Sequence, residues 1–558
     1  NRDRILNSSL ERAGIDNVHT IFSPTLWLAI RYVLKRDEFM FLSRTRAVCL
    51  AATVLLLSST VYAEDKNILF IGIDDMQVAA GCYGQSMMKT PQMDRLASKG
   101  MVFMNAYVQQ AVCAASRASL LTGCRPDTTG VNYPYTPWFI TTFVKKHPTI
   151  ADSFSKQGFY TRTLGKIHHG FPIENSFTEA HYSPEAGFFA LKENQRDDPK
   201  KKHQNLNNPW EHADLPDNAY MDGQIADETI ATIRRAVKSG KPFFIAPGFK
   251  KPHLPFVCPK KYSDLYQESD IKLSPHPELG PDQDPISIAK NGAYNWLNYR
   301  EEGINNENAR QLRHSYYACV SFVDAQIGKI LDELDQLGIA DNTVIMIWSD
   351  HGYHLGDHGA WGKSSNFELA TRSPLIVYDP GMKGGGKKTA ALVEFVDMYP
   401  TLLELAEQNI PDYLEGTSFA AILNDPAKEW KKAAFSQFPR GGDNEGYTIR
   451  TSEWRYTEWR SKKVGKPLFV ELYHCAKDPI ETRNLAEDPK HTNRLKQMKN
   501  RLEKGWKNAL PPGITNRSNN PRGVDSFYTL PKDNRTIELK KITERLKETS
   551  KNRTVISK

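Results

Sequence analysis

The sequence has few cysteines, and those that it has show no pairing pattern. Its 558 residues include 7 cysteines, with no Cys-x-x-Cys pair and no dense cluster. This excludes a disulfide-rich scaffold. Charge of one sign is not in large excess either, because 73 Lys and Arg residues face 65 Asp and Glu residues. So small an imbalance gives no reason to predict a nucleic-acid partner.

Long apolar runs are also scarce. The run at residues 47–57 is too short to span a bilayer comfortably. Two arginines precede it, and the small-residue segment Val61-Tyr62-Ala63 follows it, which is the layout of a secretory signal. We therefore expect a signal peptide at residues 40–63, starting at Met40 and cleaved near Ala63, preceded by upstream sequence at residues 1–39. This predicts a secreted or periplasmic protein without stable membrane insertion, and the alternative is a retained anchor.

What the chain does contain is strands that alternate with helices. We expect strands at residues 67–73, 101–108, 159–164, 242–248, 343–348 and 374–378, and helices at 91–99, 149–157, 222–238 and 308–337. This alternation predicts an α/β fold with a large, mainly parallel sheet covered by helices. Polar residues repeatedly follow the strand ends, which is where open α/β sheets bind their ligands.

The pattern changes after about residue 386. We expect one helix at residues 395–408, an antiparallel hairpin in the alternating aromatic segment 446–460, a strand at 471–473 and a helix at 492–508. The predicted organisation is therefore a catalytic domain at residues 64–386 and a smaller α+β subdomain with an antiparallel sheet at residues 387–510. A basic, weakly ordered tail with a possible helix at 536–548 would follow at residues 511–558.

The most informative segment is Cys113-Ala-Ala-Ser-Arg-Ala-Ser-Leu-Leu-Thr-Gly123. It puts a cysteine at the start of a strongly helical run, where unpaired backbone N–H groups and the helix dipole favour an anion. Arg117 adds a fixed positive charge one turn further on. A lone cysteine is more often a packed core residue than a reactive one, so its interpretation depends on the residues around it.

Carboxylates follow two of the predicted strands. Asp74 and Asp75 come directly after the first strand, and Asp350 and His351 follow the strand at residues 343–348. Adjacent carboxylates repel each other unless a cation compensates them, although a turn with a helix cap is the alternative for Asp74 and Asp75. Brought to one sheet edge, three carboxylates and an imidazole predict a divalent cation, with Ca²⁺ or Mg²⁺ favoured over Zn²⁺.

Cationic and imidazole side chains follow other strands. Lys166, His168 and His169 come after the strand at residues 159–164, His253 lies in a Lys-Pro-His segment after residue 248, and Lys363 lies in a glycine-rich loop after residue 351. Each alone is more often a solvated charge or a hydrogen-bonded core histidine. Together at one edge of a sheet, they predict an anion pocket that faces a metal.

With these motifs in place, the chain resembles the formylglycine-dependent sulfatases of the alkaline-phosphatase superfamily. The Cys113 segment resembles the family signature, with Ala115 where proline is commonest and Cys124 where arginine often follows Leu-Thr-Gly. Other landmarks recur in their usual order from Asn67 to about Leu485, among them Ile73-Asp74-Asp75, Gly165-Lys166, Lys251-Pro252-His253 and Ser349-Asp350-His351-Gly352. Residues 110–114, 125–129, 251–256 and 356–367 are most similar to the iduronate-2-sulfatase group.

The resemblance implies a large mixed sheet flanked by helices and a role for each site residue. Cys113 would be oxidised to formylglycine by a formylglycine-generating enzyme, and Arg117 would steady its hydrate. The residue roles that it implies are Ca²⁺ binding by Asp74, Asp75, Asp350, His351 and the modified Cys113, sulfate contact by Lys166, His253 and Lys363, and proton removal by His169 or its neighbour His168.

The activity that the resemblance implies is hydrolysis of sulfate esters in a sulfated oligo- or polysaccharide, with a uronic acid 2-O-sulfate as the expected group. Two alternatives remain. The first is a phosphonate or phosphate diester hydrolase of the same superfamily. The second is an inactive, glycan-binding homologue, but loss of function would remove site residues, and all the expected types are present.

Overall fold

The structure is a computed structural model that describes residues 65–132, 143–169, 177–194, 209–441, 444–461 and 467–519. The predicted signal peptide, the upstream segment and the tail from residue 520 onward lie outside the described residues. Among the described residues, no helix is both long enough and apolar enough to cross a membrane. Six of the seven cysteines fall in this part of the chain, and all six are free thiols.

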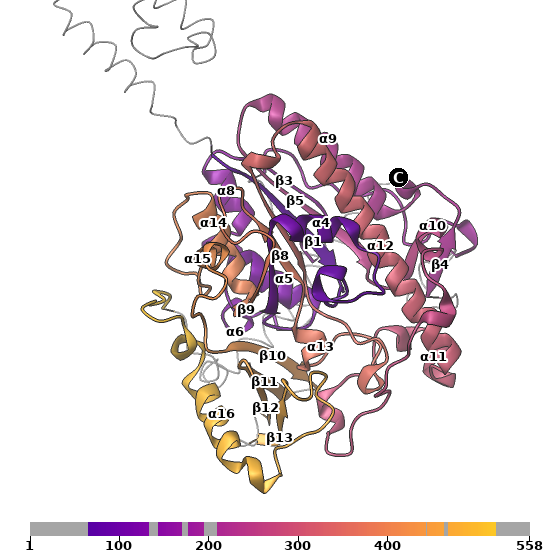
Figure 1. Cartoon of the computed structure of the whole chain (residues 1–558), viewed down its shortest axis with the longest axis vertical. Coiled ribbons are helices and arrows are strands. Elements are labelled where there is room, and N and C mark those ends of the chain that lie inside the picture. Colours follow the sequence, from indigo (N-terminus) through magenta and orange to yellow (C-terminus); the bar gives the residue numbers. More distant parts are fainter. Residues whose placement is uncertain are drawn as a thin grey trace, which may run out of the picture. The chain divides into compact units, whose positions relative to one another are not determined.

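A seven-stranded sheet forms the centre of the described chain, in the order β3-β5-β1-β7-β8-β2-β9 (Figure 1). Its strands are β1 (Asn67–Asp74), β2 (Met101–Tyr107), β3 (Tyr160–Gly165), β5 (Phe243–Pro252), β7 (Thr343–Ser349), β8 (Leu375–Tyr378) and β9 (Lys387–Glu394). Strands β3, β5, β1 and β7 run parallel, whereas β8 is antiparallel to both β7 and β2. The sheet is therefore mixed, as the family resemblance implies, and the α/β fold class is confirmed.

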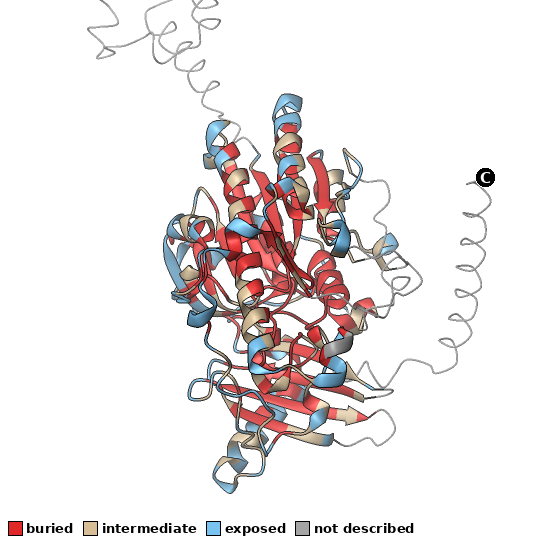
Figure 2. Cartoon of the chain, turned by 90° about the vertical axis from the view of Figure 1, so that its right-hand side faces the viewer, coloured by how far each residue is buried: buried red, intermediate tan, exposed pale blue. Residues whose placement is uncertain are grey.

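Helices cover both faces of this sheet because strand β1 is apolar on both sides. Leu69, Ile71 and Ile73 pack in a core with α4 (Pro91–Lys99), α9 (Met221–Ser239) and α12 (Asn306–Gln336). Ile68 and Phe70, which alternate with them, pack in a second core with α5 (Cys113–Thr122), α8 (Ile150–Lys156) and α14 (Met398–Leu405). Figure 2 shows the buried residues in the sheet and on the inner sides of the helices.

A four-stranded antiparallel sheet follows in the sequence, in the order β10-β11-β12-β13. Its strands are β10 (Ala434–Arg440), β11 (Asn444–Arg450), β12 (Trp454–Ser461) and β13 (Pro467–His474). Helix α16 (Thr492–Lys504) buries Met498 and Leu502 against it. The predicted hairpin is thus present as β11 and β12. Strand β9 lies within the range 387–510 expected for the smaller subdomain, yet it pairs with β2 in the large sheet.

Two predicted helices end three or four residues earlier than expected. The segment 395–408 contains a 3₁₀ turn followed by α14, which ends at Leu405. Glu407 has a φ of 57°, and this left-handed conformation cannot continue the helix. Helix α16 ends at Lys504 and is followed by Gly505, whose φ is 72°. The other strands and α-helices of the described residues are β4 (Trp210–Ala213), β6 (Phe256–Pro259), α6 (Pro126–Thr129), α10 (Lys260–Ser263), α11 (Leu297–Glu302), α13 (Glu368–Thr371) and α15 (Ala420–Asn424).

Candidate active site

The carboxyl ends of the parallel strands bring the predicted site residues to one edge of the large sheet. Asp74 is the last residue of β1, Lys166 follows β3 and Asp350 follows β7. Parallel neighbours end at the same edge, so these side chains converge although up to 276 residues separate them in the sequence. Cys113 faces them from the first position of helix α5.

Cys113 is almost fully buried, with 3% of its surface exposed, and polar groups surround its sulfur. The sulfur lies 3.0 Å from Lys363 Nζ, 3.3 Å from His351 Nε2 and 3.4 Å from Asp74 Oδ1. Lys166 Nζ lies 3.5 Å away. Burial and the Asp74 charge raise the pKa of the Cys113 thiol above its ordinary value, although the two lysines oppose this. The position therefore does not activate the unmodified thiol as a thiolate.

Five side chains offer ligand atoms that all lie within 4.8 Å of one another: Asp74, Asp75, Cys113, Asp350 and His351. The imidazole is oriented for ligation, because His351 Nδ1 lies 2.9 Å from the Gly352 carbonyl oxygen. A proton donated there leaves the Nε2 lone pair facing Cys113 and Asp75 Oδ1, the latter at 3.4 Å. Burial lowers the His351 pKa, which keeps the ring neutral. This donor set fits a hard divalent cation.

The backbone of Asp75 is held in a sparsely populated conformation. Its φ of 65° is in the left-handed region, which non-glycine residues adopt only when their surroundings hold them there. The Asp75 amide donates to Asp350 Oδ1 at 3.1 Å, and Tyr316 of α12 donates to the Asp75 carbonyl oxygen at 2.8 Å. These contacts fix the turn that brings two consecutive carboxylates to the same site.

Three cations balance the carboxylates. Lys166 Nζ pairs with Asp74 Oδ2, and Lys363 Nζ pairs with Asp75 Oδ1. Arg117 has no exposed surface, and its Nε donates to Asp350 Oδ2 at 2.9 Å. Burial by itself would raise the Asp74 pKa, but Lys166, His253 and Arg117 outweigh it and hold that pKa well below the usual range. All three carboxylates of this cluster are thus paired with positive charge.

The two adjacent histidines after β3 have different surroundings. The His168 ring stacks with Phe177 at 6.4 Å between centroids, and the His181 ring lies 6.0 Å away. Burial and the Lys166 charge lower the His169 pKa to about 4, with an opposing effect from Asp74. Lys166, Arg117 and Asp74 all act on the His169 pKa, whereas burial, His181 and Arg117 lower the His168 pKa, so we expect His169 to be the histidine that faces the reaction.

Substitution of the two histidines separates their roles. His169→Asn is expected to lower kcat by about 100-fold, the usual contribution of a proton-transfer group. His168→Asn removes a ring that stacks with Phe177, so it is expected to lower the unfolding temperature with a much smaller effect on kcat. Steady-state kinetics and thermal unfolding of both variants test this, and a larger loss of kcat in His168→Asn would contradict it.

Sequence reasoning missed one cation at the site. In the Lys250-Lys251 pair, Lys251 Nζ donates to the carbonyl oxygens of His253, at 2.6 Å, and Pro255. Lys251 therefore stabilises the loop that contains these two residues. Lys250 Nζ instead lies 4.0 Å from Asp74 Oδ2. Successive residues of a strand point to opposite faces, so the strand pattern could have shown that only one of the two lysines faces the site.

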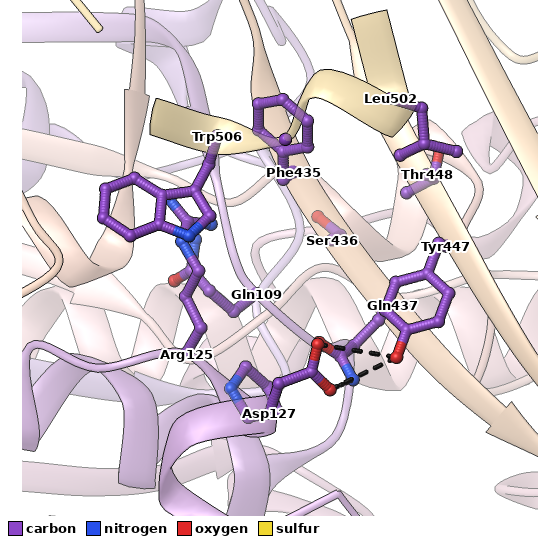
Figure 3. A pocket seen from close by; sticks show the side chains of 12 residues that line it. Gln109, Arg125, Asp127, Phe435, Ser436, Gln437, Tyr447, Thr448, Leu502 and Trp506 are labelled. Carbon is purple, nitrogen blue, oxygen red and sulfur yellow. Dashed lines mark hydrogen bonds between the residues drawn. The ribbon is translucent and has the colours of Figure 1, made fainter. Parts of the chain in front are cut away.

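A separate small pocket lies where the segment after α5 meets the four-stranded sheet (Figure 3). Arg125 makes two hydrogen bonds to Glu394, at 2.7 and 2.8 Å, and its guanidinium lies 4.8 Å from the Trp506 ring centroid. Asp127 accepts hydrogen bonds from Gln437 and Tyr447. These contacts anchor the segment that follows the Cys113 helix.

Comparisons with known proteins agree with this geometry. The family description Sulfatase matches residues 66–408, and N-sulphoglucosamine sulphohydrolase, C-terminal, matches residues 356–508. The Iduronate 2-sulfatase of Mus musculus is 32% identical, covering 85% of this chain and 99% of the relative. A protein solved with D-glucosamine-2-N,6-O-disulfate has a TM-score of 0.64 at 21% identity, covering 79% of this chain and 97% of the other. The phosphonate monoester hydrolase SpPMH from Silicibacter pomeroyi has a TM-score of 0.67 at 23% identity, covering 80% and 96%.

Proposed function

The chain belongs to the sulfatase family and is a sulfuric ester hydrolase, and we propose that it removes the 2-O-sulfate of a uronic acid in a sulfated oligo- or polysaccharide. The observation that carries the proposal is the placement of Cys113, whose sulfur lies within 3.5 Å of two lysines, His351 and Asp74. The choice of a uronic acid is supported by the 32% identity to Iduronate 2-sulfatase over most of both chains. The signal-like segment at residues 40–63 supports export.

Two groups would complete this site. We propose a Ca²⁺ ion held by Asp74, Asp75, Asp350 and His351, and a formylglycine formed from Cys113 by a separate maturation enzyme. The cluster of buried carboxylates with a neutral imidazole supports the cation. When present, the cation draws electron density from the sulfate, and the hydrated aldehyde supplies the nucleophilic oxygen.

The chain's own cations would bind and orient the sulfate. A sulfate ester resists attack because its oxygens carry negative charge, and Lys166 and Lys363 present ammonium groups beside Cys113 that offset this charge. Arg117 is fully buried and bonded to Asp350 and two backbone carbonyls, so it positions the loops around the nucleophile. The ion pairs of Lys166, Lys363 and Arg117 hold these positive charges in place before the substrate binds.

Proton movements would involve three side chains. The leaving alcohol takes a proton from His253 or Lys363. A ring nitrogen of His169, Nδ1 or Nε2, accepts the proton that must be removed before the sulfate is released and the enzyme returns to its starting state. Both histidines are in electrostatic contact with Lys166 and Asp74, which supports their place at the site. Burial lowers the pKa of each ring, which suits His169 as a proton acceptor and favours Lys363 over His253 as the donor. General acid–base steps of this kind contribute about 10²- to 10⁴-fold to a rate.

Hydrolysis assays test the proposal, with inorganic sulfate measured for the sulfated substrates and the released phenol for the phosphonate ester. Enzyme produced with a maturation enzyme is assayed on an aryl sulfate, an aryl phosphonate ester, a disaccharide with a 2-O-sulfated uronic acid and one with a 6-O-sulfated glucosamine. We expect kcat/KM for the uronic acid substrate to exceed that for the glucosamine substrate by at least ~100-fold. Faster turnover of the phosphonate would favour the other hydrolase class, and equal turnover of the two disaccharides would contradict the uronic acid.

A further inference from the structure

Three lysines of the active site are partly exposed, and one of them is paired differently from the others. The exposed fractions of the side chains are 10% for Lys166, 16% for Lys363 and 19% for Lys250. Lys166 and Lys363 each make a hydrogen bond to a carboxylate of the cluster. Lys250 lies 4.0 Å from Asp74 Oδ2, the oxygen that Lys166 already occupies. Lys250 is therefore the most exposed of the three and has the longest ion-pair contact. Burial and the nearby Lys166 lower its pKa to about 7, and a bound anion would favour its charged form.

An exposed aromatic ring accompanies Lys250. Phe188 has 46% of its surface exposed, so much of its ring is accessible to a ligand. Lys250 Nζ lies 5.2 Å from the centroid of the Phe188 ring, within the range of a cation–π contact. The pair thus combines a flat apolar surface and a positive charge, the two features that recognise an anionic sugar.

We propose that Lys250 and Phe188 form a subsite for a second anionic group on the sugar that carries the hydrolysed sulfate. This rests on the proposed sulfatase function and narrows its substrate to sugars with two negative groups. Lys250 Nζ binds a carboxylate or a second sulfate, and the Phe188 ring packs against the sugar ring. A uronic acid 2-O-sulfate meets this requirement through its carboxylate, and a disulfated hexosamine would meet it through its second sulfate.

Position distinguishes Lys250 from the lysines beside the nucleophile. Lys166 and Lys363 lie 3.5 and 3.0 Å from Cys113 Sγ. Among the described residues, Lys250 makes no hydrogen bond to that sulfur, and its ion-pair contact with Asp74 Oδ2 is longer than that of Lys166, at 4.0 Å. A group held by Lys250 is therefore displaced from the reacting sulfate, as a second substituent on the same ring would be.

The experiment compares matched substrates on the matured enzyme. One substrate is the disaccharide with a 2-O-sulfated uronic acid, and the second is the same disaccharide with its carboxylate reduced to an alcohol. A glucosamine pair, with and without a second sulfate, tests the other source of the anion. We expect wild-type kcat/KM to be about 10- to 100-fold higher for the doubly anionic member of one pair, as one charge-assisted contact provides.

Lys250→Met is expected to lower the ratio of kcat/KM between the doubly and the singly anionic substrate to about 1, mainly by raising KM for the doubly anionic one. Lys250→Arg is expected to keep this ratio above 1 because the positive charge remains. Lys260→Met is the control, since Lys260 is an exposed lysine of α10 paired with Asp264, and it should keep the wild-type ratio. A wild-type ratio of 1 in both pairs, with aryl sulfate still hydrolysed, overturns the subsite alone. Absence of hydrolysis of any sulfate ester overturns the sulfatase function and the subsite with it.

Discussion

Cys113→Ser is expected to lower kcat by at least ~10³-fold, because it removes the residue from which the nucleophile is made. A serine offers one hydroxyl where hydrated formylglycine offers two, so a sulfate transferred to it has no intramolecular route of release. The substitution is nearly isosteric, and Lys363, His351 and Asp74 can all hydrogen-bond to the new hydroxyl. We therefore expect the unfolding temperature to change by no more than about 2 °C.

Cys124→Ser is the matched control. Cys124 is also buried and lies in the same segment, but its sulfur contacts the Tyr413 carbonyl oxygen and not the site. We expect this variant to keep its turnover. Mass spectrometry of the peptide spanning residues 111–117 should show conversion of thiol to aldehyde in the wild type and an unmodified serine in Cys113→Ser. Wild-type turnover by Cys113→Ser, or only unmodified cysteine in a matured and active wild type, would contradict the mechanism.

Arg117→Met is expected to destabilise the fold by about 3–5 kcal/mol and to abolish most of the activity. Removing one partner of a buried ion pair leaves its counter-charge uncompensated, which costs more than the pair contributes when intact. Arg117 has no exposed surface and bonds to Asp350, Asp74 and the carbonyl oxygens of Lys166 and Ile167. Its loss leaves two buried carboxylates and two carbonyls without that donor.

Denaturant titration of Arg117→Met beside Arg235→Met tests this expectation. Arg235 also pairs with two glutamates, but 43% of its side chain is exposed, so its loss should cost less than about 1 kcal/mol. Arg117→Lys keeps the charge without the planar fork, and we expect stability between those of wild type and Arg117→Met. A midpoint of Arg117→Met equal to that of wild type would mean that the ion pairs of Arg117 do not hold the site together.

Much of the fold was predictable because local patterns carry it. The continuous apolar run of β1 indicated a strand buried on both faces, and its alternate residues do pack in two different cores. Two features of the sheet were not predictable. The first is that strand β8 runs antiparallel to β7. The second is that β9 pairs with β2, where the Asn105 side chain donates a hydrogen bond to the Ala390 carbonyl oxygen across 285 residues of sequence. Strand direction and pairing depend on contacts between distant segments, and local periodicity gives no information about such contacts.

The candidate site shows the same division. Asp74, Asp75, Asp350 and His351 were chosen because they follow strands, and they do lie together at one edge. Three other features had no equally clear signal in the sequence. They are the orientation of Lys250 toward the site, the stacking of His168 with Phe177 and the contact of Tyr316 with the Asp75 turn. Side-chain direction at a strand end or in a loop depends on what packs against it.

The sequence by itself determined which chemical groups are available: a cysteine at a helix start, three carboxylates, an imidazole and several lysines, each next to a strand or helix end. Residue type and local periodicity suffice for this, because both act over a few neighbouring residues. Only the tertiary structure decided which of these groups face one another. It pairs Lys166 with Asp74 and Lys363 with Asp75, and it places Lys250 beside Phe188 with a longer ion-pair contact. Electrostatic balance in a buried site depends on distances of a few ångströms between residues that are far apart in the chain, and those distances exist only after folding.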